Sequence, residues 1–215
     1  LNMKNPILEA KGISKSFGNI KALDDVDFFL EKGIIHGLLG ENGAGKSSLM
    51  NILSGIYIPE KGNLTINGQL IKRLNPDLAS SYGIGMVHQE FRLIDSFSIK
   101  DNLTLSKSNI YQNDFSEAFS KYSDIFALNL NAMTPVSELS VGEKQKVEIM
   151  KLIFHNSSIM LLDEPTAVLT PQETAQLKES LETLSQEDEK TIVLITHKLK
   201  EIKDFTETIY VMKNG

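Results

Sequence analysis

The sequence contains no cysteine, which excludes disulfide bonds and thiolate metal sites and fits a reducing compartment. No run approaches the roughly 20 apolar residues of a membrane-spanning helix, and no signal peptide is visible. Internal repeats and low-complexity tracts are absent as well. An excess of positive charge is also missing, because the net charge is −6. We therefore expect no nucleic-acid partner, and any phosphate site must be local.

What remains is the composition of an ordinary globular protein. Of its 215 residues, 41% are hydrophobic and 23% are charged, which is enough to bury a sizeable core. The length allows one large domain or one domain with an insertion, and we expect residues 1–215 to form a single domain. The sequence stops at Asn214-Gly215, just after a predicted strand, so we also expect the chain to be a piece of a longer protein.

The most informative stretch is a glycine-rich loop between a predicted strand at 34–39 and a predicted helix at 47–53. It fits the phosphate-binding pattern G-x-x-x-x-G-K-[ST]. The glycines let backbone N–H groups turn toward an anion, and the helix start adds the positive end of its dipole. Lys46 would reach the β- and γ-phosphates, and the Ser47 hydroxyl would bind Mg²⁺. The expected nucleotide-binding residues here are Gly40, Asn42, Gly43, Gly45, Lys46, Ser47 and Ser48. The alternative is a glycine turn that matches by chance, which the strand–loop–helix context disfavours.

Two adjacent carboxylates follow a second apolar strand, predicted at 158–162. Ligands gather at the carboxyl ends of strands in open α/β sheets, so Asp163 and Glu164 are candidates for the second half of a phosphoryl-transfer site. Asp163 would support Mg²⁺ through water, and Glu164 would polarise the attacking water. The alternative is an acid-rich helix N-terminus.

Two further polar residues end predicted strands. Gln89 follows the strand at 84–88 and is either a solvated loop residue or a contact to the metal or the attacking water. His197 follows the strand at 191–195. A lone histidine is usually structural, but this one ends a strand as Gln89 and Asp163 do, so it can face the same γ-phosphate.

The N-terminal part is expected to be antiparallel, with strands at 7–10, 26–30 and 63–66 and a hairpin turn at Asn67-Gly68. Phe17 lies in a polar, glycine-containing stretch between the first two strands. It could stack on a purine or be a core residue at a strand end, and spacing alone favours the core. The remaining predicted elements are helices at 76–82 and 171–184 and a strand at 208–212.

Residues 98–106, 116–128 and 141–154 have helical spacing and indicate a helical insertion at about 90–156 between two strands of the sheet. Ser140 is a suitable cap for the third helix. An apolar stripe on this helix predicts a face turned to a core, made by Val147, Met150, Ile153 and Phe154. The loop at 139–143 could be simply a helix start.

These motifs stand in one order: the loop at 40–47, Gln89, the Leu-Ser-Val-Gly-Glu stretch at 139–143, Asp163-Glu164 and His197. That order resembles the ATP-binding subunits of ABC transporters over nearly the whole chain, and Leu-Ser-x-Gly is rarely found outside that superfamily. The resemblance implies an α/β fold: a P-loop NTPase core with a mostly parallel sheet, an N-terminal antiparallel β subdomain and a helical insertion.

The resemblance also implies roles and cofactors, namely ATP and Mg²⁺. Phe17 would stack on adenine, which reverses the preference from spacing. Gln89 would contact Mg²⁺ and sense the membrane partner. Ser140 and Gly142 would cap the γ-phosphate bound to an opposing domain. Glu164 would be the catalytic carboxylate, and His197 the γ-phosphate switch.

Within the superfamily, the segments at 85–91, 139–149 and 163–173 look like those of simple-sugar and nucleoside importers, and Ala-Val-Leu-Thr-Pro-Gln-Glu leans to the nucleoside branch. In that group one polypeptide carries two such domains in tandem, and this chain looks like the first. Val141 and Glu143 stand where the usual signature has Gly and Gln, and Thr170 stands where the family usually has Asp. These departures are shared by the subgroup, although the cross-interface contact of that Asp does not carry over.

The resemblance therefore implies three partners: a second ABC ATPase domain, transmembrane permease subunits and a substrate-binding protein. It implies a peripheral position on the cytoplasmic face of the membrane. A soluble ABC ATPase of DNA repair or translation is the alternative, but the coiled coils, zinc modules and basic linkers of such proteins are absent from the sequence. A nucleotide-gated binding module without hydrolysis is a third reading, which intact Glu164 and His197 disfavour.

Overall fold

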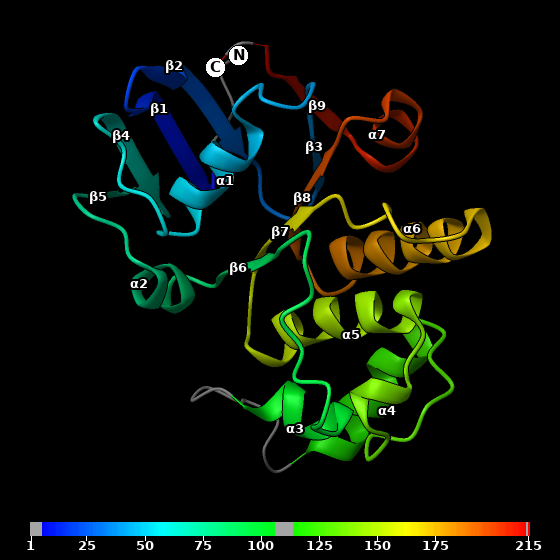
Figure 1. Ribbon diagram of the computed structural model, residues 1–215. Helices are drawn as coiled ribbons and strands as arrows, with labels where there is room; N and C mark the ends of the chain where they lie inside the picture. The colour runs from blue at the N-terminus through cyan, green and yellow to red at the C-terminus, as the bar shows by residue number, and fades with distance from the viewer. Residues whose placement is uncertain (1–5, 106–113, 214) are drawn as a thin grey trace.

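The computed structural model describes residues 6–105, 114–213 and 215 (Figure 1). Across these ranges no helix has the length and apolar character needed to span a bilayer. Position 106, the last residue of the first expected insertion helix, lies outside the described residues.

An antiparallel sheet of four strands, in the order β2-β1-β4-β5, is built from the N-terminal third of the chain. Its strands are β1 (Leu8–Phe17), β2 (Ile20–Leu30), β4 (Lys61–Ile66) and β5 (Gln69–Ile71). The hairpin turn expected at Asn67-Gly68 joins β4 to β5, and both residues have positive φ, 50° and 76°. That backbone suits the two-residue turns that match strand twist.

A parallel sheet of five strands, in the order β6-β7-β8-β3-β9, carries the other motifs. Its strands are β6 (Ile84–Val87), β7 (Ile159–Asp163), β8 (Thr191–Thr196), β3 (Ile35–Leu39) and β9 (Thr208–Val211). In the register, Asp163 is opposite Ile195 and Leu39 is opposite Thr196. The carboxyl ends of β3, β7 and β8 are therefore level, and the loops that follow them begin at one edge of the sheet.

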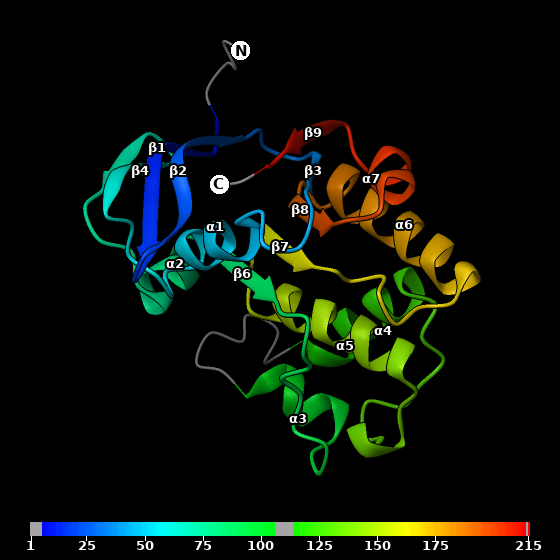
Figure 2. The same ribbon diagram turned by 45° about the horizontal axis from the view of Figure 1, so that its top comes forward.

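Strands β7 and β8 read as unbroken apolar runs because both of their faces are buried, whereas the edge strand β9 leaves Ile209 and Val211 exposed. Along β7, Met160 and Leu162 join a core with the insertion helices, whereas Ile159 and Leu161 join a core with the antiparallel sheet. Figures 1 and 2 show the same arrangement, with the antiparallel sheet and α1 (Lys46–Leu53) on one side of β7 and the insertion helices on the other.

The insertion between β6 and β7 is helical and contains α3 (Ile99–Thr104), α4 (Phe115–Ile125), the 3₁₀ turn η1 (Val136–Glu138) and α5 (Val141–Phe154). Helix α5 begins at a reciprocal cap, in which the Ser140 hydroxyl accepts from the Glu143 N–H and the Glu143 carboxylate accepts from the Ser140 N–H. The apolar stripe of α5 predicted from the sequence is fully buried. The predicted fold class is confirmed.

The remaining helices are α2 (Pro76–Ser81), α6 (Pro171–Gln186) and α7 (Leu199–Phe205). Helix α7 was not predicted from the sequence, although Ile202 and Phe205, which it buries, are spaced as one helical turn requires. Strands β1 and β2 also run further than expected, to Phe17 and from Ile20. Most of the polar residues there are exposed or half-buried, Ser14 is buried, and the backbone stays paired with shifts in register.

Candidate functional site

The glycine loop joins β3 to α1, as its sequence predicts. Gly43 and Gly45 have φ of 84° and 100°, which favours glycine. A Cβ at Gly45 would lie 2.4 Å from the carbonyl oxygen of Ala22, so no side chain fits there. Gly45 precedes α1, and no side chain caps the helix. The first N–H groups of α1 are therefore available to an anion.

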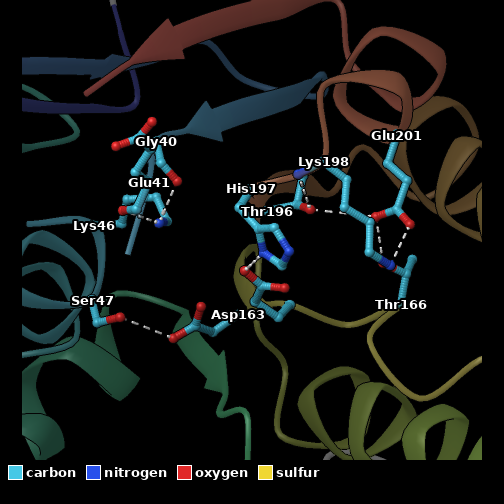
Figure 3. A network of polar contacts seen from close by, with 11 residues as sticks. Gly40, Glu41, Lys46, Ser47, Asp163, Thr166, Thr196, His197, Lys198 and Glu201 are labelled. Atoms are coloured by element: carbon cyan, nitrogen blue, oxygen red, sulfur yellow. Dashed lines mark hydrogen bonds and ion pairs between the residues drawn. The ribbon is translucent and has the colours of Figure 1, made fainter. Parts of the chain in front are cut away.

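Lys46 bends back over the loop that precedes it. Its ammonium donates to the carbonyl oxygens of Gly40 at 2.7 Å and Glu41 at 3.0 Å, and the residue is only 7% exposed (Figure 3). A cation held this close to a glycine loop is suited to bind phosphate oxygens.

Ser47 and Asp163 meet across the cleft, with 3.4 Å between the hydroxyl oxygen and the carboxylate (Figure 3). Burial raises the pKa of Asp163, and the neighbouring charge of Glu164 raises it further. A cation beside this carboxylate would offset both effects. A hydroxyl and a carboxylate are ligands that Mg²⁺ accepts alongside substrate phosphates, so these two residues fit such an ion. Among the described residues no three His, Asp or Glu side chains cluster as a metal site.

Glu164 and His197 are in direct contact, with Oε1 of the glutamate 2.6 Å from Nδ1 of the histidine. Glu164 follows β7 with φ of 51°, and His197 follows the neighbouring strand β8. The positive φ turns the chain sharply away from the strand. The carboxylate thus lies at the carboxyl ends of the strands, where the glycine loop also begins.

One open cleft of about 380 Å³ brings these groups together. Its lining includes the loop and helix start at 42–48, together with Gln89, Asp163, Glu164 and His197. Residues 20–22, at the start of β2, also line it and were missed by the sequence reasoning. Their position depends on how the antiparallel sheet packs beside the loop, and no local motif marks them. Gly40 lies outside this lining and contributes its carbonyl oxygen to Lys46.

Phe17 lies at the end of β1 and is 42% exposed, so the core interpretation favoured by spacing is wrong. Its ring contacts Tyr57 edge-on at 5.1 Å between centroids, and the Lys15 ammonium lies 5.5 Å from its centroid. The role in adenine stacking that the resemblance implies stays a prediction.

Ser140 and Gly142 lie outside the cleft, at the N-terminus of α5. A Cβ at Gly142 would lie 2.3 Å from Oε1 of Glu173, so the glycine permits close packing of α5 against α6. Thr170, at the position where an Asp is usual, is the N-cap of α6 and exchanges hydrogen bonds with Glu173. The signature and the phosphate loop thus form separate surfaces of one chain.

A glycine loop between a parallel strand and a helix, with acidic residues at the end of a nearby parallel strand, defines a phosphate-loop nucleotide-binding fold. A family model described as ABC transporter matches residues 23–167. The chain belongs to the ABC transporter family.

Known relatives agree with this membership. The nucleoside import ATP-binding protein NupA of Lactococcus lactis is 40% identical over 97% of this chain, and the ribose import ATP-binding protein RbsA of Caldanaerobacter subterraneus is 41% identical over 98%. This chain covers 42% and 43% of their lengths, so it spans about two fifths of the curated relatives it matches.

Solved structures of similar fold include a nucleotide-free ATP-binding cassette from an ABC transporter, with TM-score 0.86, 25% identity, and coverage of 98% of this chain and 88% of that one. A dimeric bacterial ABC transporter cassette has TM-score 0.84 and 27% identity, with coverage of 97% and 95%.

Proposed function

We propose that this chain is a nucleotide-binding domain that binds and hydrolyses Mg-ATP to drive an importer of nucleosides or simple sugars. The observation that carries the proposal is the convergence of Lys46, the Ser47–Asp163 pair and the Glu164–His197 pair on one cleft. Family membership supports it, and so do the printed functions of NupA and RbsA, which are nucleoside import and ribose import.

The glycine loop would bind the triphosphate. Backbone N–H groups at 42–48 would surround the phosphates. The Lys46 ammonium would exchange its two carbonyl contacts for β- and γ-phosphate oxygens, so its donors stay paired. Phe17 would stack on adenine from the exposed end of β1, which lies near the start of β2 in the same antiparallel sheet.

Mg²⁺ fits the hydroxyl of Ser47 and the carboxylate of Asp163, with Gln89 as a further oxygen donor in the same cleft. When bound, the ion neutralises charge on the phosphate oxygens. The hydrogen bond between Ser47 and Asp163 would hold both side chains in place before substrate binds.

Glu164 would act as the general base for hydrolysis. A water oxygen would bond to the γ-phosphorus as the bond to ADP breaks, and the water proton would pass toward the Glu164 carboxylate. His197, 2.6 Å from that carboxylate, would hold it in place and sense the γ-phosphate. Ser140 and Gly142 lie outside the cleft, so they would serve a nucleotide on an opposing domain.

That separation supports a proposal about the domain organisation. We propose that residues 1–215 form one ATPase domain, with a helical subdomain at about 90–156, in a longer polypeptide that carries a second domain in tandem. Permease subunits and a substrate-binding protein would complete the importer, with this domain at the cytoplasmic face of the membrane. Nucleic acid is not an expected partner, since the net charge is −6.

The test has two arms. Purified chain is incubated with ATP, with Mg²⁺ or with EDTA, and phosphate release is followed. Magnesium-dependent release is expected, and its absence together with absent ATP binding would overturn the enzymatic proposal. For the transport role, membrane vesicles holding the full polypeptide and its permease, supplied with the substrate-binding protein of the same system, are assayed for ATP-driven uptake of labelled guanosine and ribose. Activity without uptake of either, and with association to DNA or ribosomes, would favour the soluble alternative.

A further inference from the structure

A carboxylate outside the cleft, Glu201 on α7, joins the two loops that carry Glu164 and His197 (Figure 3). Its Oε2 accepts a hydrogen bond from the Thr166 hydroxyl at 2.5 Å and another from the Thr196 hydroxyl at 3.4 Å. Its Oε1 accepts from the Lys198 ammonium at 2.8 Å. Neither Glu201 nor Thr166 lines the cleft.

The chain positions of these partners give the contact its significance. Thr166 lies two residues after Glu164, and Thr196 and Lys198 stand on either side of His197. The Lys198 N–H also donates to the Thr196 hydroxyl at 3.1 Å, which closes the turn around His197. One carboxylate thus holds the loop after β7 against the loop after β8.

Burial makes these hydrogen bonds hard to replace. Thr166 is 3% exposed and Thr196 is fully buried, so water cannot readily take over if the carboxylate is removed. Glu164 itself has a positive φ of 51°, which is uncommon for a residue other than glycine and is favoured here by restraints from its surroundings. The Thr166–Glu201 hydrogen bond is one such restraint, acting two residues away.

We propose that Glu201 is a positioning residue for hydrolysis: through Thr166 and Thr196 it sets the distance between the Glu164 carboxylate and the His197 ring. Its effect on turnover rests on the proposed ATPase function, but its effect on the Glu164–His197 contact does not. A merely structural role, in which Glu201 only attaches α7, is the competing account.

The chain offers a matched control in Asp188. Its carboxylate accepts from the Tyr122 hydroxyl at 2.9 Å and the Lys121 ammonium at 2.7 Å. Its side chain is 15% exposed, against 16% for Glu201. Asp188 lies after α6 against α4 and does not line the cleft. Asp188→Ala therefore removes the same kind of interaction at the same burial, away from the reaction.

The first readout is the ¹⁵N chemical shift of the His197 ring nitrogens in the nucleotide-free chain, assigned with His197→Gln. Glu164→Ala gives the shift for a broken contact. Glu201→Ala is expected to move the Nδ1 resonance toward that value, and Asp188→Ala to leave it at the parent value. Thr166→Val, which removes only the hydroxyl donor, should move the Nδ1 resonance as Glu201→Ala does. This second variant keeps the proposal testable if Glu201→Ala fails to fold. Parent-like shifts in both Glu201→Ala and Thr166→Val would overturn the proposal.

The second readout is kinetic. A small displacement of a catalytic group lowers turnover strongly, so Glu201→Ala should lower kcat by roughly ten- to a hundredfold while KM for ATP stays within about twofold, as for a loss confined to the transition state. Thr166→Ser should restore the turnover that Thr166→Val loses. Adding Thr166→Val to Glu201→Ala should cost little more than either alone. Additive losses, or a kcat no lower than that of Asp188→Ala, would refute positioning. A parent chain that does not hydrolyse ATP would refute the proposed function instead, and the ring-nitrogen shifts would still decide the role of Glu201.

Discussion

Oε1 of Glu164 lies 2.6 Å from Nδ1 of His197, although the two residues are 33 positions apart in the sequence. Each follows one of two neighbouring parallel strands, and the register sets Asp163 opposite Ile195. The contact therefore depends on the alignment of β7 with β8. It brings a carboxylate and an imidazole to the mouth of the cleft, where the phosphate loop also begins.

Glu164→Gln should keep ATP binding and slow hydrolysis. A carboxamide cannot take up a water proton as a carboxylate does, and general-base catalysis contributes typically ~10²–10⁴-fold. Turnover and ATP affinity are measured on the same preparation. Glu179→Gln, on the exposed face of α6, is the control and should behave as the parent chain does. Parent-level turnover in Glu164→Gln would exclude this residue as the base.

Lys46→Ala should weaken ATP binding at least tenfold. The ammonium is buried beside the loop carbonyls, and a hydrogen bond to a charged group contributes roughly 1.5–3 kcal/mol. Calorimetric titration with ATP measures the effect. Lys32, which pairs with Glu189 outside the cleft, provides the control substitution Lys32→Ala. Equal affinities for the two variants would remove Lys46 from the phosphate site.

Phe17→Ala should weaken ATP binding but leave affinity for inorganic triphosphate unchanged, whereas Phe17→Tyr should be tolerated. Stacking on a base contributes ~1–3 kcal/mol, and the exposed ring contributes little to the core. Competition between the two ligands separates the effects. An equal loss of affinity for both would point to a folding defect instead of a lost adenine contact.

Glu148→Gln should stabilise the chain at neutral pH. Burial raises the pKa of Glu148, outweighing the hydrogen bond it accepts from the Arg92 N–H at 2.5 Å and the charge of Lys151. A carboxyl whose pKa is higher in the folded state takes up a proton more readily there. Its penalty is present when both states are ionised and is relieved as the pH falls through the folded pKa.

Urea unfolding from neutral pH down to below the ordinary pKa of glutamate measures the difference in free energy of unfolding between the parent chain and the Gln variant. The Gln variant should exceed the parent in free energy of unfolding at neutral pH, and the two should converge below the ordinary glutamate pKa, because the parent side chain is then neutral in both states. A difference that is constant with pH would contradict this account.

The isolated chain should bind Mg-ATP, remain mainly monomeric and hydrolyse ATP slowly, because Ser140 and Gly142 lie away from its own cleft. Without an opposing domain, part of the triphosphate charge faces water, where electrostatic stabilisation is weak. Light scattering and ATPase assays on this chain and on a tandem polypeptide compare turnover per site. A monomeric chain as fast as the tandem protein would refute the shared site.

Local sequence determined the loop at 40–47, the strand-end residues Gln89, Asp163, Glu164 and His197, and the helical insertion. Glycines, a lysine and a capping serine act within one turn of their neighbours, so their spacing alone carries the information. The apolar runs at 158–162 and 191–195 likewise predict strands that are buried on both faces.

Only the tertiary structure decided which of these elements meet. Strand order cannot be read from spacing, because β3 lies between β8 and β9, and these strands lie more than 150 residues after it in the chain. The exposure of Phe17, the lining at 20–22 and the bridge from Glu201 to Thr166 all depend on packing between segments distant in sequence. The local pattern around Glu201 is that of any acidic residue near a helix start. Its importance arises because two parallel strands end side by side, with α7 packed beside them.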